Sequence, residues 1–293
     1  MHSRLKGPTL STFVIYTIIG LLLVICLFPF LNIFAISLSS NRAIISNMVS
    51  VLPVQFTTVS YQVVFRDNSM MRSLIFTIAL TFTYTLLAMT MTIFMAYPMT
   101  FKELKGRNIF LVFFLLTMYF SGGMIPDYLL IRDLGLINKV WALILPGLIS
   151  TYNMIIMRTF FNTIPDSLKE SARLDGCSNI RILFSIIIPL STAAIATLSL
   201  FYAVGKWNSF QDALFYISNP NLYPLQLRLY NVVFNNMAIE ITTAEGMTDL
   251  MNNVNNESLK AACIIFSTVP ILVVYPWLQK YFIKGVMIGA LKG

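Results

Sequence analysis

Long apolar stretches without a charged residue recur along the chain and predict its secondary structure. A helix needs about 20 such residues to cross the roughly 30 Å hydrocarbon core of a bilayer. Leu, Ile, Phe, Val and Met fill six stretches that reach or approach this length, at residues 10–41, 73–101, 108–126, 140–157, 182–205 and 261–279. The first, with Pro29 as an expected kink, is too long for a signal peptide's apolar core. The pattern predicts an all-α integral membrane protein, with residues 1–293 as one domain of six transmembrane helices.

Composition and charge support a membrane protein and suggest its orientation. The chain is 57% hydrophobic and 11% charged, whereas an ordinary soluble domain has roughly 25% charged residues. Its net charge is +8. The basic excess falls in the N-terminus, the second-to-third and fourth-to-fifth connections and the C-terminus, while the other connections are nearly balanced. The positive-inside rule then places both termini in the cytoplasm, so the charge reports topology rather than nucleic-acid binding.

The connections on the other side are expected to be extracytoplasmic. They comprise residues 42–72, a short re-entry around 127–139, and a long Asn-rich segment at 206–260. Asn favours turns, because its side chain hydrogen-bonds to nearby backbone groups. Short helices broken by turns are therefore predicted in the last segment.

Several classes of chemistry lack their usual residues. The six apolar stretches contain no carboxylate, lysine or histidine, which argues against an ion-coupled carrier. The chain has no phosphate-binding G-x-x-x-x-G-K-[ST] motif, its single histidine is His2, and its three cysteines are far apart. We expect no enzyme activity, metal or cofactor in this chain, so energy for transport must come from another subunit.

The connection between the fourth and fifth stretches predicts a short cytoplasmic helix. Thr163 and Asp166 have the spacing of a capping box, and Pro165 suits a first helical turn because its missing N–H needs no partner. Gly176 supplies the backbone freedom with which helices commonly end. The predicted helix runs from Pro165 to Asp175.

The apolar positions of this helix allow two interpretations. Ile164, Leu168 and Ala172 recur every four residues, whereas Lys169 and neighbouring charges lie to the side. Such a helix either lies on the membrane surface or docks its apolar face into a groove on a partner.

A motif within residues 162–189 resembles that of bacterial ABC importer permeases, E-A-A-x-x-x-G, nine residues, then I-x-L-P. The matching positions here are Glu170-Ser171-Ala172, Gly176 and Ile186-Ile187-Ile188-Pro189. The chain departs from the motif at Ser171 and Ile188, both mild changes of volume. The resemblance implies a type I importer permease fold with a cytoplasmic coupling helix.

The resemblance covers nearly the whole chain. Within the family, the chain is most similar to the carbohydrate branch, the maltose-type inner permeases. Residues 125–146, 207–210 and 281–293 carry it, and 122–126 resemble the subset serving complex or acidic oligosaccharides such as alginate. Residues 212–213 depart, with Asp-Ala where many carbohydrate permeases have Pro-Leu. The resemblance implies a heterodimer with a second permease in the bacterial inner membrane, two ATPase subunits that use ATP and Mg²⁺, and an extracytoplasmic solute-binding protein.

The resemblance also assigns site residues. Glu170 resembles the acid that contacts the ATPase, and the alternative for it is a solvated loop charge. The residues expected to complete the coupling element are Leu168, Ser171, Ala172, Asp175, Gly176 and Pro189.

The transport path is expected to use uncharged polar and aromatic side chains, since sugars offer hydroxyls and C–H faces. The candidates are Asn32, Tyr84, Tyr119, Tyr152, Asn153, Ser191, Thr192 and Tyr202, although such residues also make ordinary helix contacts. Tyr152, Asn153 and Thr192 are favoured because they flank the fifth stretch. For an acidic sugar, Arg132, Lys139 and Lys206 are available near the outer mouth, or they serve as topological anchors. The alternatives to an oligosaccharide importer are an ABC permease for another solute, and a stand-alone channel or ion-coupled carrier.

Overall fold

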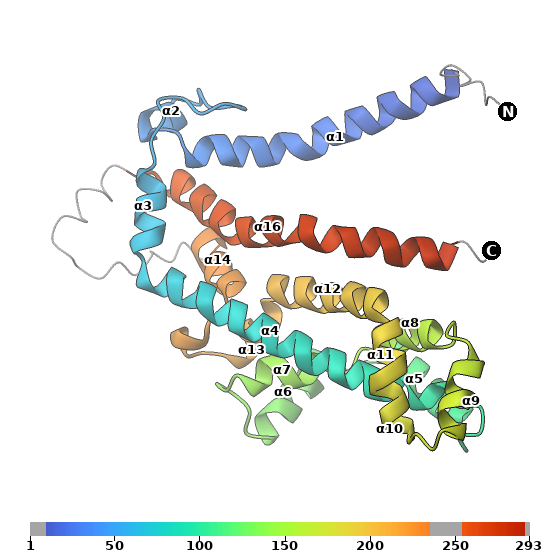
Figure 1. Cartoon of the computed structure of the whole chain (residues 1–293). Helices are drawn as coiled ribbons and strands as arrows, with labels where there is room; N and C mark the ends of the chain where they lie inside the picture. The colour runs from blue at the N-terminus through green and yellow to red at the C-terminus, as the bar shows by residue number, and fades with distance from the viewer. Residues whose placement is uncertain (1–9, 235–253, 291–293) are drawn as a thin grey trace. The chain divides into compact units, whose positions relative to one another are not determined.

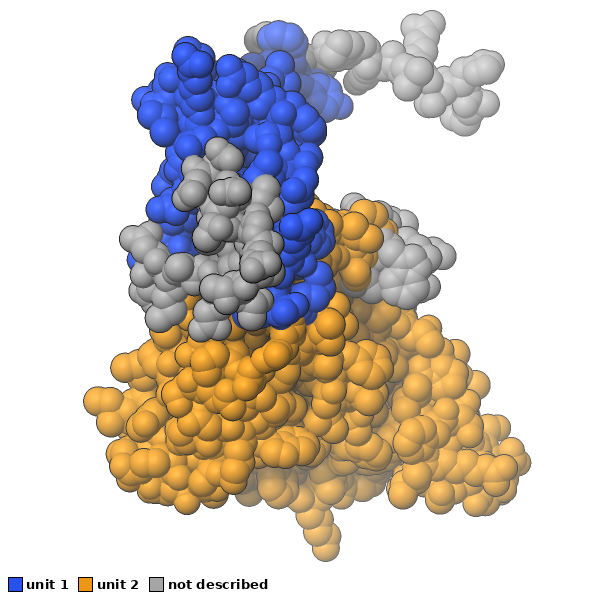
Figure 2. Space-filling model, turned by 90° about the vertical axis from the view of Figure 1, so that its left-hand side faces the viewer, with its two compact units in different colours: residues 1–71, 232–268 blue, residues 72–231, 269–293 orange. Residues whose placement is uncertain are grey.

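The computed structural model describes residues 10–234 and 254–290, which are helical and contain no β-strand. Arg4 and Lys6, much of the Asn-rich segment and the last three residues lie outside these ranges. The described chain divides into two compact units, residues 1–71 with 232–268 and residues 72–231 with 269–293 (Figure 2). The prediction of a single domain stays a prediction.

The first unit contains the N-terminal helix and the beginning of the C-terminal one. Its helices are α1 (Leu10–Ser37), α2 (Asn41–Ile45), α3 (Val59–Arg66) and the first part of α16 (Asn256–Ala290). The helix α1 continues through Pro29, and its apolar side chains before Ala35 are largely exposed. Between α3 and α16, the ring of Phe65 meets Phe266 edge-on at 5.4 Å, and the Ser60 hydroxyl donates to Ser258.

The second unit contains the remaining helices, and its boundaries fall inside α4, α14 and α16. In chain order they are α4 (Asn68–Ala96), η1 (Pro98–Thr100), α5 (Arg107–Tyr119), α6 (Met124–Asp133), α7 (Trp141–Ile144), η2 (Leu145–Gly147), α8 (Thr151–Phe161), α9 (Asp166–Leu174), α10 (Asn179–Ile182), η3 (Leu183–Ile187), α11 (Ile188–Leu190), α12 (Thr192–Asn208), α13 (Gln211–Tyr216), η4 (Pro220–Leu222) and α14 (Leu225–Phe234). The short α13, η4 and α14 confirm the expectation of helices broken by turns.

Three helices of the described chain are long and apolar enough to cross a membrane alone, and the number is up to 6 if each bent pair counts as one span. The single helices are Thr12–Ser37 within α1, Asn68–Thr100, which includes α4 and η1, and Asn256–Val274 at the beginning of α16. The bent pairs are α5 with α6 at 111°, α7–η2 with α8 at 53°, and α10–α11 with α12 at 82°. Six crossings therefore agree with the sequence, whereas three of the predicted helices are broken rather than continuous.

Glycine and proline account for the breaks. Gly123, at φ +87°, separates α5 from α6, and Pro146 lies in the tight turn η2 that precedes α8. In the third pair, Pro189 follows the π-helical turn η3 and lacks the N–H that a regular helix would require. These residues bend the chain where an apolar pattern alone predicts a straight helix.

Helices also continue beyond the charge-free stretches. The fifth stretch ends at residue 205, but α12 continues to Asn208 and so carries Lys206 on its last turn. A charge near the end of a helix can keep its ammonium in a polar region while the helix continues. In the second unit, α9 lies near the C-terminal end of α4, and α13 packs on α6 and α7 towards the opposite end (Figure 1).

Candidate functional site

The short helix predicted from Pro165 to Asp175 is present as α9 (Asp166–Leu174). Its N-cap is Pro165, in an extended conformation, so Thr163 lies outside the helix. The Thr163 hydroxyl donates to the Phe160 carbonyl at 2.7 Å instead of capping α9. The predicted capping box is therefore wrong, because the proline takes the position that the threonine would need.

The end of α9 is a Schellman motif built on Gly176. The Gly176 N–H donates to the carbonyl of Arg173 at 3.0 Å, and the Cys177 N–H donates to that of Ala172 at 2.9 Å. Gly176 adopts φ +80°, a conformation that side-chain-bearing residues rarely take, and nothing lies within 4 Å of a Cβ built there. The glycine is therefore needed for its backbone and not for lack of space.

The faces of α9 differ from the predicted pattern. Ile164 and Ala172 are buried in the chain's own core, but Leu168 is 43% exposed whereas Lys169 is only 9% exposed. The stem of Lys169 covers the protein surface while its ammonium reaches the Asp166 carboxylate at 3.0 Å. That hydrogen bond, and then the charge of Lys169, lower the pKa of Asp166. The exposed apolar surface of α9 consists of Leu168 and of Leu174, which is 89% exposed.

Aromatic and cationic side chains connect α9 to the end of α4. The Arg173 guanidinium lies 5.4 Å from the centre of the Phe101 ring, and Tyr97 contacts Phe101 and Phe161 edge-on at 5.0 and 6.3 Å. Arg158 donates from Nε to the Met99 carbonyl at 2.8 Å. Glu170 and Asp175 are both exposed. The contact between Arg173 and Phe101 attaches α9 to this network in addition to its connections along the chain.

The remaining predicted coupling residues surround this helix. Ser171 is exposed on α9, and Pro189 lies in α11 beyond the π-helical turn. The assignment of a coupling role to them stays a prediction, since their geometry shows position alone.

A second feature of the same unit is the polar cavity, a hollow of about 290 Å³. Its lining residues are Tyr84, Gly147, Ser150, Asn153, Phe201, Tyr202, Gly205, Lys206, Ser209 and Asp212. They come from α4, η2, the start of α8, the end of α12 and the start of α13. The cavity therefore collects hydroxyl, amide and charged groups within a bundle that is otherwise apolar.

Hydrogen bonds and a cation–π contact fix the walls of the polar cavity. The Tyr84 hydroxyl donates to the Gly147 carbonyl at 2.6 Å, and Tyr202 shares a 2.7 Å hydrogen bond with Thr92. The Lys206 ammonium lies 4.9 Å from the centre of the Tyr84 ring. It also donates to the Asp212 carboxylate at 3.4 Å. The cavity thus has an ordered wall and one lysine turned into it.

The structure brings together only some of the predicted transport-path residues. Asn153, Tyr202 and Tyr84 line the polar cavity. The other five do not line it. Tyr119, Tyr152 and Thr192 are exposed, at 81% for Tyr119 and 57% for Tyr152, whereas Ser191 is buried. Asn32 belongs to the first unit and donates to the Ser50 carbonyl at 2.7 Å.

Sequence reasoning missed six lining residues: Gly147, Ser150, Phe201, Gly205, Ser209 and Asp212. Ser150 had a local signal, because a serine after a Pro-Gly turn is a favoured N-cap, and its hydroxyl accepts from the Asn153 N–H at 3.3 Å. Nothing in the local sequence places the other five in a cavity.

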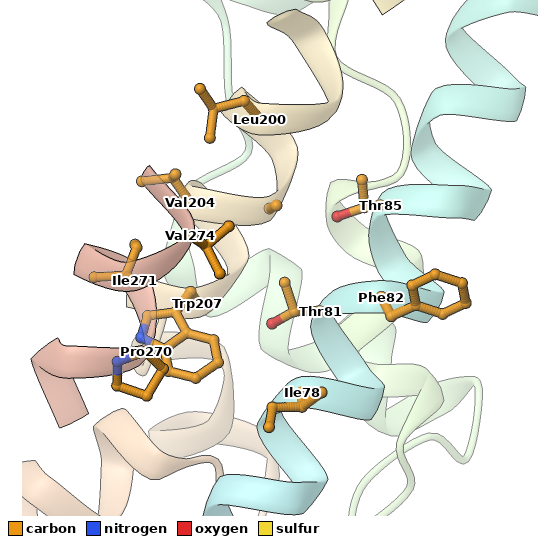
Figure 3. Close-up of a pocket in the computed structure, with 11 residues that line it drawn as sticks. Ile78, Thr81, Phe82, Thr85, Leu200, Val204, Trp207, Pro270, Ile271 and Val274 are labelled. Atoms are coloured by element: carbon orange, nitrogen blue, oxygen red, sulfur yellow. The ribbon is translucent and has the colours of Figure 1, made fainter. Parts of the chain in front are cut away.

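A separate cavity of about 400 Å³ lies among α4, α12 and α16 and has an apolar lining (Figure 3). Thr81 and Thr85 point their hydroxyls towards it, and neither hydroxyl oxygen has a hydrogen-bond partner in the described chain. Ile78, Val204 and Ile271 are among its apolar walls. Such a surface suits hydrocarbon rather than a sugar, which would leave its own hydroxyls without partners.

Comparison with known protein families shows which family the chain belongs to. Residues 82–288 match the family model of the binding-protein-dependent transport system inner membrane component. The chain belongs to this family. The match includes α9, Gly176 and the polar cavity, so the permease resemblance based on the motif residues is confirmed.

Related proteins confirm the type I ABC permease fold and the carbohydrate branch. The permease is 36% identical over 95% of its length to the polygalacturonan/rhamnogalacturonan transport system permease protein YtcP of Bacillus subtilis, of which 97% is covered. It is 42% identical over 92% of its length to protein LplC of the same species, of which 90% is covered. A crystal structure of a bacterial ABC transporter involved in importing the acidic polysaccharide alginate has a chain with TM-score 0.87 and 29% identity, covering 96% of this chain and 100% of that one.

The contact between Tyr84 and Gly147 gives a testable prediction for the permease. A Cβ at Gly147 would lie 2.6 Å from the Tyr84 hydroxyl oxygen and 3.5 Å from the nearest ring carbons. Gly147→Ala should therefore lower the free energy of unfolding by about 1–3 kcal/mol through overpacking. Tyr84→Phe removes the clashing oxygen, so the double variant should recover most of that loss. Thermal unfolding of the purified proteins measures the coupling, and strictly additive losses would contradict it.

Proposed function

We propose that this permease imports oligosaccharides, including acidic ones, as one membrane subunit of an ATP-driven importer. The observation that carries the proposal is the polar cavity, whose hydroxyl, amide and aromatic groups match the hydroxyls and C–H faces of a sugar. Its single lysine adds a cation that a uronate would favour. The acidic substrates that the names of YtcP and of the alginate importer state support the same class.

The proposed assembly contains a second, different permease, two cytoplasmic ATPase subunits and an extracytoplasmic solute-binding protein. ATP and Mg²⁺ belong to the ATPase subunits, while this chain carries no cofactor and catalyses no reaction. Both termini and α9 lie in the cytoplasm, as the distribution of basic residues indicates. The exposed side of α9 then faces the ATPase, with Glu170 as its acidic contact.

Reconstitution tests this function. The permease, its co-encoded partners and the binding protein are placed in proteoliposomes, and uptake of short oligogalacturonates and of neutral galactooligosaccharides is measured with ATP. ATP-dependent uptake of the acidic probe, absent without the binding protein, is expected. Uptake that persists without the ATPase subunits would favour a channel or carrier. ATP hydrolysis stimulated only by a non-carbohydrate solute would favour the other importer class.

Glu170 gives a prediction for the interface with the ATPase. Glu170→Ala should lower oligosaccharide uptake by about 10- to 100-fold, because a charge-assisted contact worth about 1.5–3 kcal/mol is lost. Uptake per assembled complex in proteoliposomes measures the effect. Glu103→Ala is the matched control, since Glu103 is another exposed acid on the expected cytoplasmic side but lies outside α9. Equal losses in the two variants would show that Glu170 acts only through overall surface charge.

A further inference from the structure

Lys206 is the buried cation of the polar cavity. Its side chain is 7% exposed, although it lies on the last turn of a helix in a membrane-crossing pair. An ionisable side chain at such a position is costly to bury and normally serves a function. An anchor at the membrane surface would instead extend its ammonium into water. Lys206 turns inward, over the ring of Tyr84.

The ion pair that neutralises Lys206 is weakly held. Asp212 is its only carboxylate partner in the described chain, through one oxygen at 3.4 Å, which is long for a charge-assisted hydrogen bond. The Asp212 side chain is 40% exposed and therefore retains access to water. Moving Asp212 away leaves a carboxylate that water can solvate, but it leaves the ammonium in need of another anion.

The surroundings of Lys206 suit a sugar acid as that other anion. Asn153, Ser150 and Ser209 line the cavity, and each offers hydrogen-bonding groups for sugar hydroxyls. The aromatic rings of Phe201 and Tyr202 supply apolar faces for the C–H side of a pyranose. A carboxylate on such a ring would replace Asp212 at the ammonium. The ammonium would then keep an anionic partner, while water solvates the displaced Asp212 carboxylate.

We propose that Lys206 binds the carboxylate of an acidic oligosaccharide during its passage, and that Asp212 is the counter-ion which the substrate displaces. Lys206 thereby selects for uronates over neutral sugars. This inference rests on the proposed function. It adds a specificity-determining residue to the permease, independently of the binding protein that delivers the substrate.

Three variants distinguish this role from a structural ion pair. Lys206→Met keeps most of the aliphatic stem and removes the charge, Lys206→Arg keeps the charge, and Asp212→Asn removes the competing carboxylate. Uptake of short oligogalacturonates into proteoliposomes is measured per assembled complex as a function of the concentration of loaded binding protein. Lys206→Met should lower uptake about tenfold, as expected for losing a charged hydrogen bond. Lys206→Arg should restore most of it. Asp212→Asn should raise uptake above that of wild type at low concentrations of loaded binding protein, because no carboxylate then competes with the substrate for the ammonium.

The opposite result for Asp212 would overturn the proposal. If the pair only stabilises the fold, Asp212→Asn leaves a buried lysine without its partner and should reduce uptake as much as Lys206→Met. Lys139→Met is the matched control, because Lys139 is an exposed lysine on the same expected side and does not line the cavity. Uptake by Lys139→Met should equal that of wild type. If Lys139→Met lost as much uptake as Lys206→Met, the effect would be due to net charge alone. Failure of the wild-type complex to import any oligosaccharide would instead refute the proposed function.

Discussion

Gly176→Val should abolish most oligosaccharide uptake while the complex still assembles. Valine at φ +80° costs about 1–2 kcal/mol or more, because its Cβ meets the following carbonyl in the left-handed conformation. The chain avoids this strain by leaving that conformation, which breaks the two hydrogen bonds that end α9. The helix is then no longer held at a fixed angle to α10, so closure of the ATPase moves α9 without moving the transmembrane helices. Uptake and ATP hydrolysis measured on one proteoliposome preparation should show hydrolysis without transport.

Gly176→Asn is the control for this prediction. Asparagine enters the left-handed conformation more readily than other side chains, and the space around the Gly176 Cβ position is open. The asparagine variant should therefore keep most of its uptake. Normal uptake by an assembled Gly176→Val protein would show that this helix end is not needed for coupling.

The sequence sufficed for features that depend on neighbours along the chain. Apolar stretches located all three single and all three bent candidate spans, because crossing a bilayer requires a long run of apolar side chains whatever the fold. Gly176 was predicted as a helix end because a Schellman motif is made within a few residues. The bend at Gly123 was missed, since an apolar count does not register where the hydrogen-bonding pattern of the backbone is interrupted.

The polar cavity depends on segments far apart in the chain, which explains why it was only partly predicted. Tyr84 and Gly147 meet through a hydrogen bond across 63 positions of sequence. No periodicity signals such a contact, and a glycine carbonyl carries no side-chain signature. Lys206 was noted only as a basic residue near the outer mouth, because its burial follows from the continuation of α12 to Asn208 and from the return of α13.

The exposed leucines of α9 show how packing changes the interpretation of a periodic pattern. Ile164 and Ala172 contact the permease's own core, so the predicted apolar face does not dock as a whole. Leu168 and Leu174 remain uncovered in this chain. A helix that packs one side on its own core and exposes two leucines among charged residues fits a lever between two bodies better than it fits a helix lying on lipid.

Leu168→Asp together with Leu174→Asp should therefore detach the ATPase subunits. Burying each leucine against a partner contributes about 1.5–3 kcal/mol, and an aspartate at the same contact adds a desolvation cost. The ATPase should bind more than about 100-fold more weakly, since each 1.4 kcal/mol corresponds to a tenfold change in affinity. Titration of the ATPase onto the purified permease pair measures this directly. Leu52→Asp is the control, because Leu52 is 75% exposed in the connection expected on the extracytoplasmic side. Undiminished ATPase binding by the double variant would place the ATPase contact elsewhere on the permease.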